Sequence, residues 1–89
     1  MKLEEETVVA VVKRLRRAEG QVRGIIAMLE DGRDCADVVT QVAAVSRALD
    51  RAGFALIASG LRQCVAAEVK GESAGLDSAA LERLFLSLA

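Results

Sequence analysis

The longest helical pattern in the sequence runs from Cys35 to Lys70, and its length limits what the rest of the chain can form. Apolar residues recur in it every three or four positions, which is the spacing of the buried face of a helix. The chain contains no proline, and no stop signal for a helix occurs before Gly71. A straight helix of this length rises about 50 Å. In a chain of 89 residues, it leaves room for two further helices.

The segment before it predicts another long helix, over residues 4–30. Apolar residues from Val8 to Leu29 keep the same spacing, and the acidic run Glu4–Glu6 stands where the helix dipole favours negative charge. Gly32 follows the pattern at a position where helices often end in a left-handed residue.

The segment after it predicts a short third helix that reaches the C-terminus. Asp77 is placed to cap this helix, as Asp34 is placed to cap the long one. Leu76 and Leu81 form an apolar pair across its first turn. The predicted fold class is therefore all-α, with three helices in a single domain over residues 1–89.

The composition narrows the function classes. The chain has no histidine, which excludes Ser-His and Cys-His catalytic pairs and histidine zinc sites, so we expect no enzyme. The N-terminal residues resemble no export signal, and the longest uncharged apolar stretch, Ala52–Leu61, has about half the length of a membrane span. We therefore expect a cytoplasmic protein with no membrane partner. Because 53% of so short a chain is apolar, we also expect copies of the chain to cover one another.

Cys35 and Cys64, the two cysteines, both fall on the long predicted helix. Their spacing corresponds to about eight full turns, which places both thiols on one stripe about 43 Å apart. They cannot meet within one straight helix. They meet if two copies pair antiparallel about a midpoint near Leu49 and Asp50, and the product is two equivalent Cys35–Cys64 sites in each dimer. The alternative is that both cysteines are inert packing residues.

The same antiparallel register makes a further prediction about the dimer. Most of the facing residues would be apolar or small: Val38 lies opposite Leu61, Val42 opposite Ile57, Val45 opposite Phe54, and Ser46 opposite Gly53.

Basic residues gather on one half of the first predicted helix, although the net charge of the chain is −1. They are Lys13, Arg14, Arg16, Arg17 and Arg23. Arg47 and Arg51 add a pair one turn apart on the long helix. Repeated over an oligomer, these arginines predict contacts with several DNA phosphates. The alternative is an ordinary solvated helix face.

The sequence resembles the CsoR/RcnR/FrmR family of bacterial repressors over residues 8–88. The resemblance rests on the segments Arg14–Ile25, Asp34–Val38, Gln41–Val45, Ala48–Ala52 and Leu61–Val65. It implies an antiparallel dimer that forms a four-helix bundle, and a disc-shaped tetramer built from two dimers. It also implies that Arg14 and Arg51 bind operator DNA; Arg16, Arg17 and Arg47 are added from the charge pattern alone.

The effector that the resemblance implies depends on histidine. Copper-sensing members carry a histidine at the place of Gly60, and this chain has none. Two cysteines without the histidine are similar to the CstR branch, which senses persulfides. We therefore expect a repressor of sulfur-detoxification genes, with no metal or cofactor, that releases its operator when Cys35 and Cys64 of neighbouring subunits become joined by a di-, tri- or tetrasulfide.

Three alternatives stay open at this point. The first is a Cu(I)-responsive repressor in which the same two thiolates hold the soft ion. The second is a thiol enzyme that moves sulfane sulfur, and the third is a plain helical assembly module without specific DNA affinity.

Overall fold

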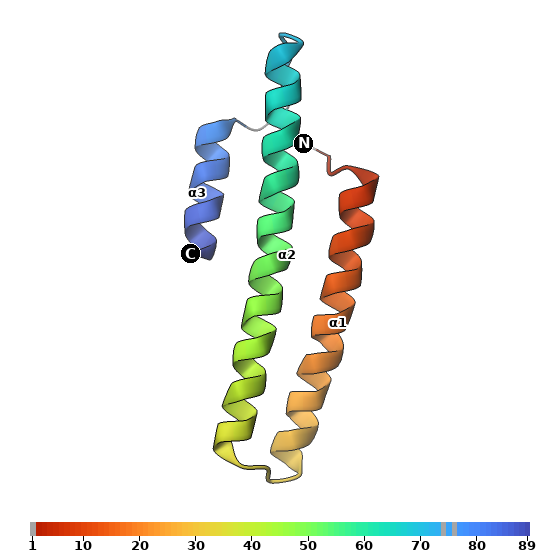
Figure 1. Cartoon of the computed structure of the whole chain (residues 1–89), viewed down its shortest axis with the longest axis vertical. Coiled ribbons are helices and arrows are strands. Elements are labelled where there is room, and N and C mark those ends of the chain that lie inside the picture. The colour runs from red at the N-terminus through yellow and green to blue at the C-terminus, as the bar shows by residue number, and fades with distance from the viewer. Residues whose placement is uncertain (1, 74, 76) are drawn as a thin grey trace.

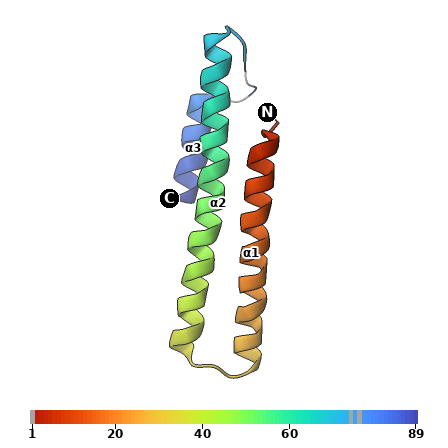
Figure 2. The ribbon, with the colours of Figure 1, turned by 45° about the vertical axis from the view of Figure 1, so that its right-hand side comes forward.

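The computed structural model describes residues 2–73, 75 and 77–89, and these form three helices. The helices are α1 (Glu5–Glu30), α2 (Cys35–Val69) and α3 (Ser78–Leu88). Helices α1 and α2 form a long antiparallel hairpin, and α3 packs on the other side of the upper part of α2 (Figure 1). Figure 2 shows from a second direction that α2 lies between α1 and α3. The predicted all-α fold with three helices is confirmed.

Local signals explain where α2 and α3 begin. The Asp34 carboxylate accepts a hydrogen bond of 3.2 Å from the backbone N–H of Ala36, and the Asp77 carboxylate accepts one of 2.7 Å from that of Ala80. Both are N-cap bonds, which satisfy backbone donors that the first turn leaves free. The predicted apolar pair of Leu76 and Leu81 involves Leu76, which lies outside the described residues.

The two long helices end in the same way. Gly32 and Gly71 both have a φ of +71°, a left-handed conformation that glycine adopts without strain. After each glycine the next backbone N–H returns to a carbonyl in the last turn, from Arg33 to Met28 at 2.9 Å and from Glu72 to Ala67 at 2.8 Å. This is the Schellman arrangement, which satisfies the free carbonyls of a helix end.

The core of the hairpin follows a seven-residue repeat on α2. Its buried residues include Val38, Val45, Ala52 and Ser59, and the buried residues of α1 are Thr7, Val11 and Ala18. Val38 and Val45 are 8% and 7% exposed within a single chain. They therefore belong to the inside of the hairpin, and the two dimer pairs predicted for them, with Leu61 and Phe54, do not fit this structure.

Gly53 allows α3 to approach α2 closely. A Cβ atom on Gly53 would lie 2.7 Å from Cδ1 of Leu88, at the end of α3. The rings of Phe54 and Phe85 pack beside this point, with centroids 5.4 Å apart. Small and aromatic side chains thus fix α3 against the upper half of α2.

A single chain leaves much of its apolar surface uncovered. Its radius of gyration is 17.0 Å, whereas a compact chain of this length has about 12 Å. Its accessible surface of 6537 Å² is about 1,500 Å² larger than that of a compact monomer of equal mass. Large apolar side chains are exposed on both long helices, among them Val22, Ile26, Leu29, Val39, Val42 and Leu49.

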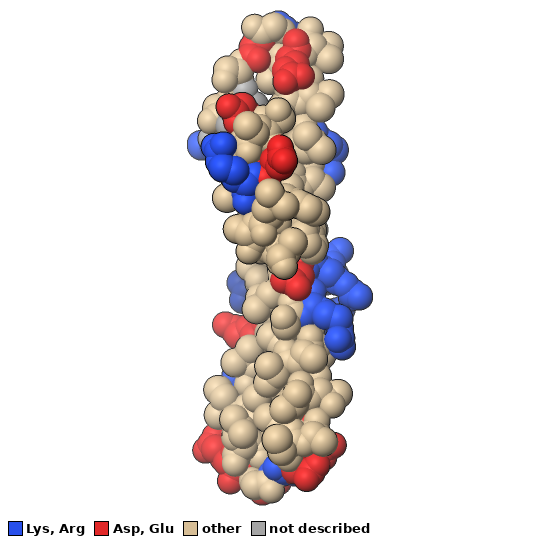
Figure 3. Space-filling view, turned by 90° about the vertical axis from the view of Figure 1, so that its left-hand side faces the viewer, with Lys and Arg blue, Asp and Glu red and all other residues tan. Residues whose placement is uncertain are grey.

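Few charged side chains lie on this apolar surface. On the face that carries α3, a broad uncharged area occupies much of the lower half of the molecule (Figure 3). Of the described helices, α2 is the one long and apolar enough to cross a membrane, by length and composition alone. The sequence analysis expected no stretch of membrane-spanning length, because it counted only uncharged residues. In α2, a few charged residues stand between the apolar ones.

Candidate functional site

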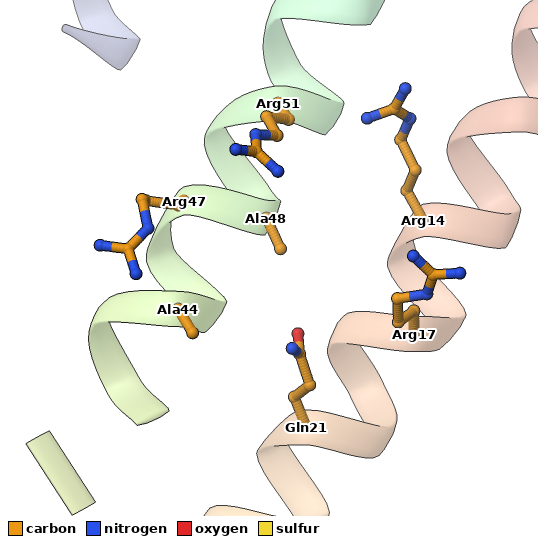
Figure 4. A pocket seen from close by; sticks show the side chains of 7 residues that line it. All are labelled: Arg14, Arg17, Gln21, Ala44, Arg47, Ala48 and Arg51. Carbon is orange, nitrogen blue, oxygen red and sulfur yellow. The ribbon is translucent and has the colours of Figure 1, made fainter. Parts of the chain in front are cut away.

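Four arginines from two helices surround one groove. The groove lies between α1 and α2, has a volume of about 320 Å³, and is lined by Arg14, Arg17, Gln21, Ala44, Arg47, Ala48 and Arg51. The arginines recur at helical spacing on each helix, so the antiparallel hairpin brings both sets to the same place. Figure 4 shows Arg14 reaching from α1 toward α2, with the two small alanines on the opposite helix.

None of the four guanidinium groups forms an ion pair within the described part of the chain. The ion pairs seen there join Arg23 to Glu19 and Arg33 to Asp37, at 3.5 and 3.9 Å, and both are exposed. Unpaired guanidinium groups that face one groove repel one another and attract an anion. Their planar forks of N–H donors match phosphate oxygens in particular. The groove is thus suited to bind a phosphate group.

The structure separates the arginines that the sequence placed together. Arg14, Arg17, Arg47 and Arg51 line the groove, but Arg16 does not. Arg16 is exposed on α1, as are Lys13 and Arg23. The sequence could not make this distinction, because a helical wheel shows which residues share a half of one helix and not which of them meet the neighbouring helix.

The two thiols occupy opposite ends of α2. Cys35 is its first residue and is exposed, whereas Cys64 lies in the last turns and is 5% exposed. The rise of a helix separates them by about 43 Å. A site that uses both thiols therefore requires a second copy of the chain.

The described residues of a single chain contain no group of three or more histidine, cysteine, aspartate or glutamate side chains that could hold a metal ion. Thiolate sulfur is a soft ligand that selects soft ions such as Cu(I).

A polar cluster surrounds the buried Ser59, which precedes Cys64 by five residues on α2. Ser59 is fully buried, and its hydroxyl donates to Oε1 of Glu4 at 3.1 Å. The same hydroxyl accepts from Oγ1 of Thr7 at 3.1 Å and from Nε2 of Gln63 at 3.4 Å. The cluster ties the start of α1 to the part of α2 that carries Cys64. Sequence reasoning missed it, although Thr7 and Ser59 continue the spacing of the buried stripes.

The amino-acid sequence is similar to those of known transcriptional repressors. The family described as metal-sensitive transcriptional repressor matches residues 8–86. The chain is 44% identical over 81 residues to the copper-sensing transcriptional repressor RicR of Mycobacterium tuberculosis, covering 84% of each protein. It is 40% identical over 60 residues to the copper-sensing transcriptional repressor CsoR of Bacillus subtilis, covering 67% of this chain and 59% of that protein.

A solved structure shows the same fold. The crystal structure of the copper-sensing repressor CsoR with Cu(I) from Geobacillus thermodenitrificans superposes with a TM-score of 0.69 and 32% sequence identity. The superposition covers 99% of this chain and 84% of that one.

The three-helix fold and these relatives define the class of helical transcriptional repressors. The chain belongs to the metal-sensitive transcriptional repressor family. The predicted membership of the CsoR/RcnR family is thus confirmed. The relatives are transcriptional repressors, which confirms that the chain is not an enzyme.

Proposed function

We propose that the chain is a Cu(I)-responsive repressor that binds operator DNA as an oligomer and releases it when Cys35 and Cys64 of neighbouring copies bind the ion. The observation that carries this proposal is the placement of one thiol at each end of α2, in a chain similar to copper-sensing repressors. These relatives favour Cu(I) as the effector. The missing histidine had instead suggested a persulfide effector and no cofactor.

The donor set fits the ion. Two thiolates suffice to hold Cu(I), which prefers sulfur over oxygen ligands. Bound there, the ion would join α2 of one copy to α2 of the next. The chain's own part is to present Cys35 from an exposed helix start and Cys64 from a buried position, directly after Gln63 of the Ser59 cluster in the sequence. The fit rests on sulfur alone, because the chain has no histidine.

The uncovered apolar surface supports assembly. The excess surface of about 1,500 Å² in a single chain is of the size that a stable protein–protein interface buries. We propose that a second copy, rather than lipid, covers the exposed face of α2 around Val42 and Leu49, in an antiparallel dimer that pairs further into a tetramer. The whole of residues 1–89 then acts as one domain of a cytoplasmic protein.

The groove supplies the DNA contact in this proposal. Arg14 and Arg17 from α1 and Arg47 and Arg51 from α2 would bind backbone phosphates, and the oligomer would repeat the contact along the duplex. Arg16 stands outside the groove and contributes only to the general positive potential around it.

A persulfide-responsive switch is the second candidate, and the absence of histidine favours it. The Cys35 thiolate would attack the outer sulfur of an organic persulfide, which transfers that sulfur and releases the organic thiolate. The Cys64 thiolate of a second copy would then attack the Cys35 sulfur and expel hydrosulfide, which leaves a disulfide between the copies. A longer polysulfide link needs further sulfane sulfur from the same reagent.

One experiment separates the two candidates. Duplexes that the protein retains are first selected from a random library, and their release is then measured with Cu(I), an organic persulfide or hydrogen peroxide, with intact mass recorded in parallel. We expect release by Cu(I) with no covalent mass change, and loss of this response in both Cys35→Ala and Cys64→Ala, with Gln41→Ala as the control. Release by persulfide alone, with a covalent dimer in the mass spectrum, would replace the copper proposal by the persulfide one.

A further inference from the structure

The carboxamide oxygen of Gln21 lacks a hydrogen-bond partner. Oε1 of Gln21 is shielded from solvent. Among the described residues that are not exposed, it is the one shielded side-chain oxygen or nitrogen atom without a hydrogen-bond partner. A buried acceptor without a donor is costly, and a native fold retains one where something else supplies the donor. Figure 4 shows the carboxamide pointing into the space between α1 and α2.

The donors available to this oxygen are guanidinium groups. Apart from Gln21 itself, the groove is lined by four arginines and by two alanines, whose side chains donate nothing. Arg17 precedes Gln21 by four residues, the spacing at which side chains on one helix meet. Arg17 is therefore the donor that the helix itself brings nearest.

We propose that Gln21 is a positioning residue for phosphate binding in this groove, and the proposal rests on the DNA-binding function proposed above. Oε1 accepts one N–H of the Arg17 guanidinium, and the rest of that planar fork then faces a phosphate of the DNA backbone. A guanidinium carries five N–H donors, so it can serve the amide and a phosphate together.

The charge of the groove explains why this contact depends on the anion. Four like charges around about 320 Å³ repel one another, and this repulsion keeps Arg17 from turning inward. A phosphate that enters the groove removes the repulsion, so that Arg17 can lie between the phosphate and the amide. Gln21 thereby increases affinity for the backbone without reading a base.

The test compares Gln21→Met, which keeps the length of the side chain but lacks the acceptor, with the parent protein and with Gln41→Met. Gln41 is exposed on α2 and outside the groove, so it serves as the matched control. Binding of a selected duplex and of a random duplex is measured over a range of salt concentrations. We expect Gln21→Met to weaken both about equally, by about tenfold, and to reduce the slope of log affinity against log salt by about 0.9, the value of one phosphate contact.

A double-mutant cycle tests whether Gln21 acts through Arg17. In the Arg17→Ala background, Gln21→Met should change neither the affinity nor the salt slope, because the guanidinium that it orients is gone. Additive effects, an unchanged slope in the single variant, or a loss confined to the selected duplex would each overturn the proposal.

A measurement with inorganic pyrophosphate keeps this test separate from the proposed function. Pyrophosphate should raise the melting temperature of the parent and of Gln41→Met more than that of Gln21→Met. If the parent binds no duplex but shows this difference, the groove serves a free phosphate ligand, and the assignment to DNA is wrong. If the three proteins respond equally to pyrophosphate, Gln21 has no part in anion binding.

Discussion

The hydroxyl of Thr7 donates a hydrogen bond of 3.1 Å to the hydroxyl of Ser59, fifty-two residues further along the chain, inside the hairpin. Ser59 also donates to Glu4 and accepts from Gln63, so its one donor and two acceptor positions are all used. The bond fixes the register of α1 against α2. The same register brings Arg14 and Arg17 opposite Arg47 and Arg51.

Replacement of Ser59 by alanine should destabilise the protein. The change leaves the Thr7 and Gln63 donors without their acceptor in a buried place, which costs about 1–3 kcal/mol. Urea unfolding at a fixed protein concentration measures the loss. Gln41→Ala, at an exposed position of α2, should stay within about 0.5 kcal/mol of the parent. Equal stability of the two variants would show that the Ser59 cluster contributes nothing.

Two glycines inside helices should respond differently to alanine. A Cβ atom on Gly20 would have no neighbouring atom within 4 Å, so Gly20→Ala should stabilise the protein by about 0.5–1 kcal/mol through helix propensity. At Gly53 the added carbon would meet Leu88, which must turn aside and lose packing, so Gly53→Ala should gain less or nothing. In a Leu88→Ala background the gain at Gly53 should return. Urea unfolding measures all three changes. If Gly53→Ala stabilises as much as Gly20→Ala in the parent, α3 does not pack as described.

The groove arginines should matter more for DNA than the arginine outside it. Arg14→Ala and Arg51→Ala should each weaken duplex binding and reduce the salt slope by about 0.9, because each removes one phosphate contact. Arg16→Ala carries the same change in net charge and is the matched control; its slope should change by clearly less. A fluorescence anisotropy titration over salt checks this. Equal effects of the changes at Arg14 and Arg16 would show that the groove does not supply the DNA contact.

The exposed apolar face should hold the oligomer together. Leu49 is 48% exposed in a single chain and lies at the midpoint of the proposed antiparallel pairing. Leu49→Asp should therefore raise the concentration at which sedimentation detects dissociation by about tenfold or more, since the new carboxylate would lie opposite Asp50 of the second copy and like charges repel. In this register Val69 lies beyond the end of the second copy's α2, so Val69→Asp should leave assembly unchanged. Similar dissociation of both variants would contradict the pairing.

The sequence predicted the helices well because their signals are local. Asp34, Asp77, Gly32 and the apolar spacing act within a few residues of where they stand, and the structure confirms each of them. The roles of Val38 and Val45 were predicted wrongly, because α1 and α2 each carry two apolar faces and periodicity does not say which one meets the other helix of the hairpin.

The site was predicted in part for the same reason. Charge pattern and resemblance selected the arginines, and the structure was needed to bring four of them together and to separate Arg16. Gln21 gave no signal as a single residue, because a lone polar side chain in a helix is ordinary until its neighbours are known. Ser59 gave only its place on the buried stripe, which does not show its partners. The joint role of Cys35 and Cys64 stays a prediction, since it depends on a second copy.

In the proposed repressor, Cys35 of one copy and Cys64 of another form one Cu(I) site, and subunit mixing tests this pairing. Cys35→Ala and Cys64→Ala chains carrying different affinity tags are co-expressed, the mixed dimer is purified, and its Cu(I) content is titrated against a competing chelator. We expect no tight Cu(I) binding by either variant alone and one tight site in the mixed dimer, against two in the parent dimer. A mixed dimer that binds no more than the separate variants would contradict it.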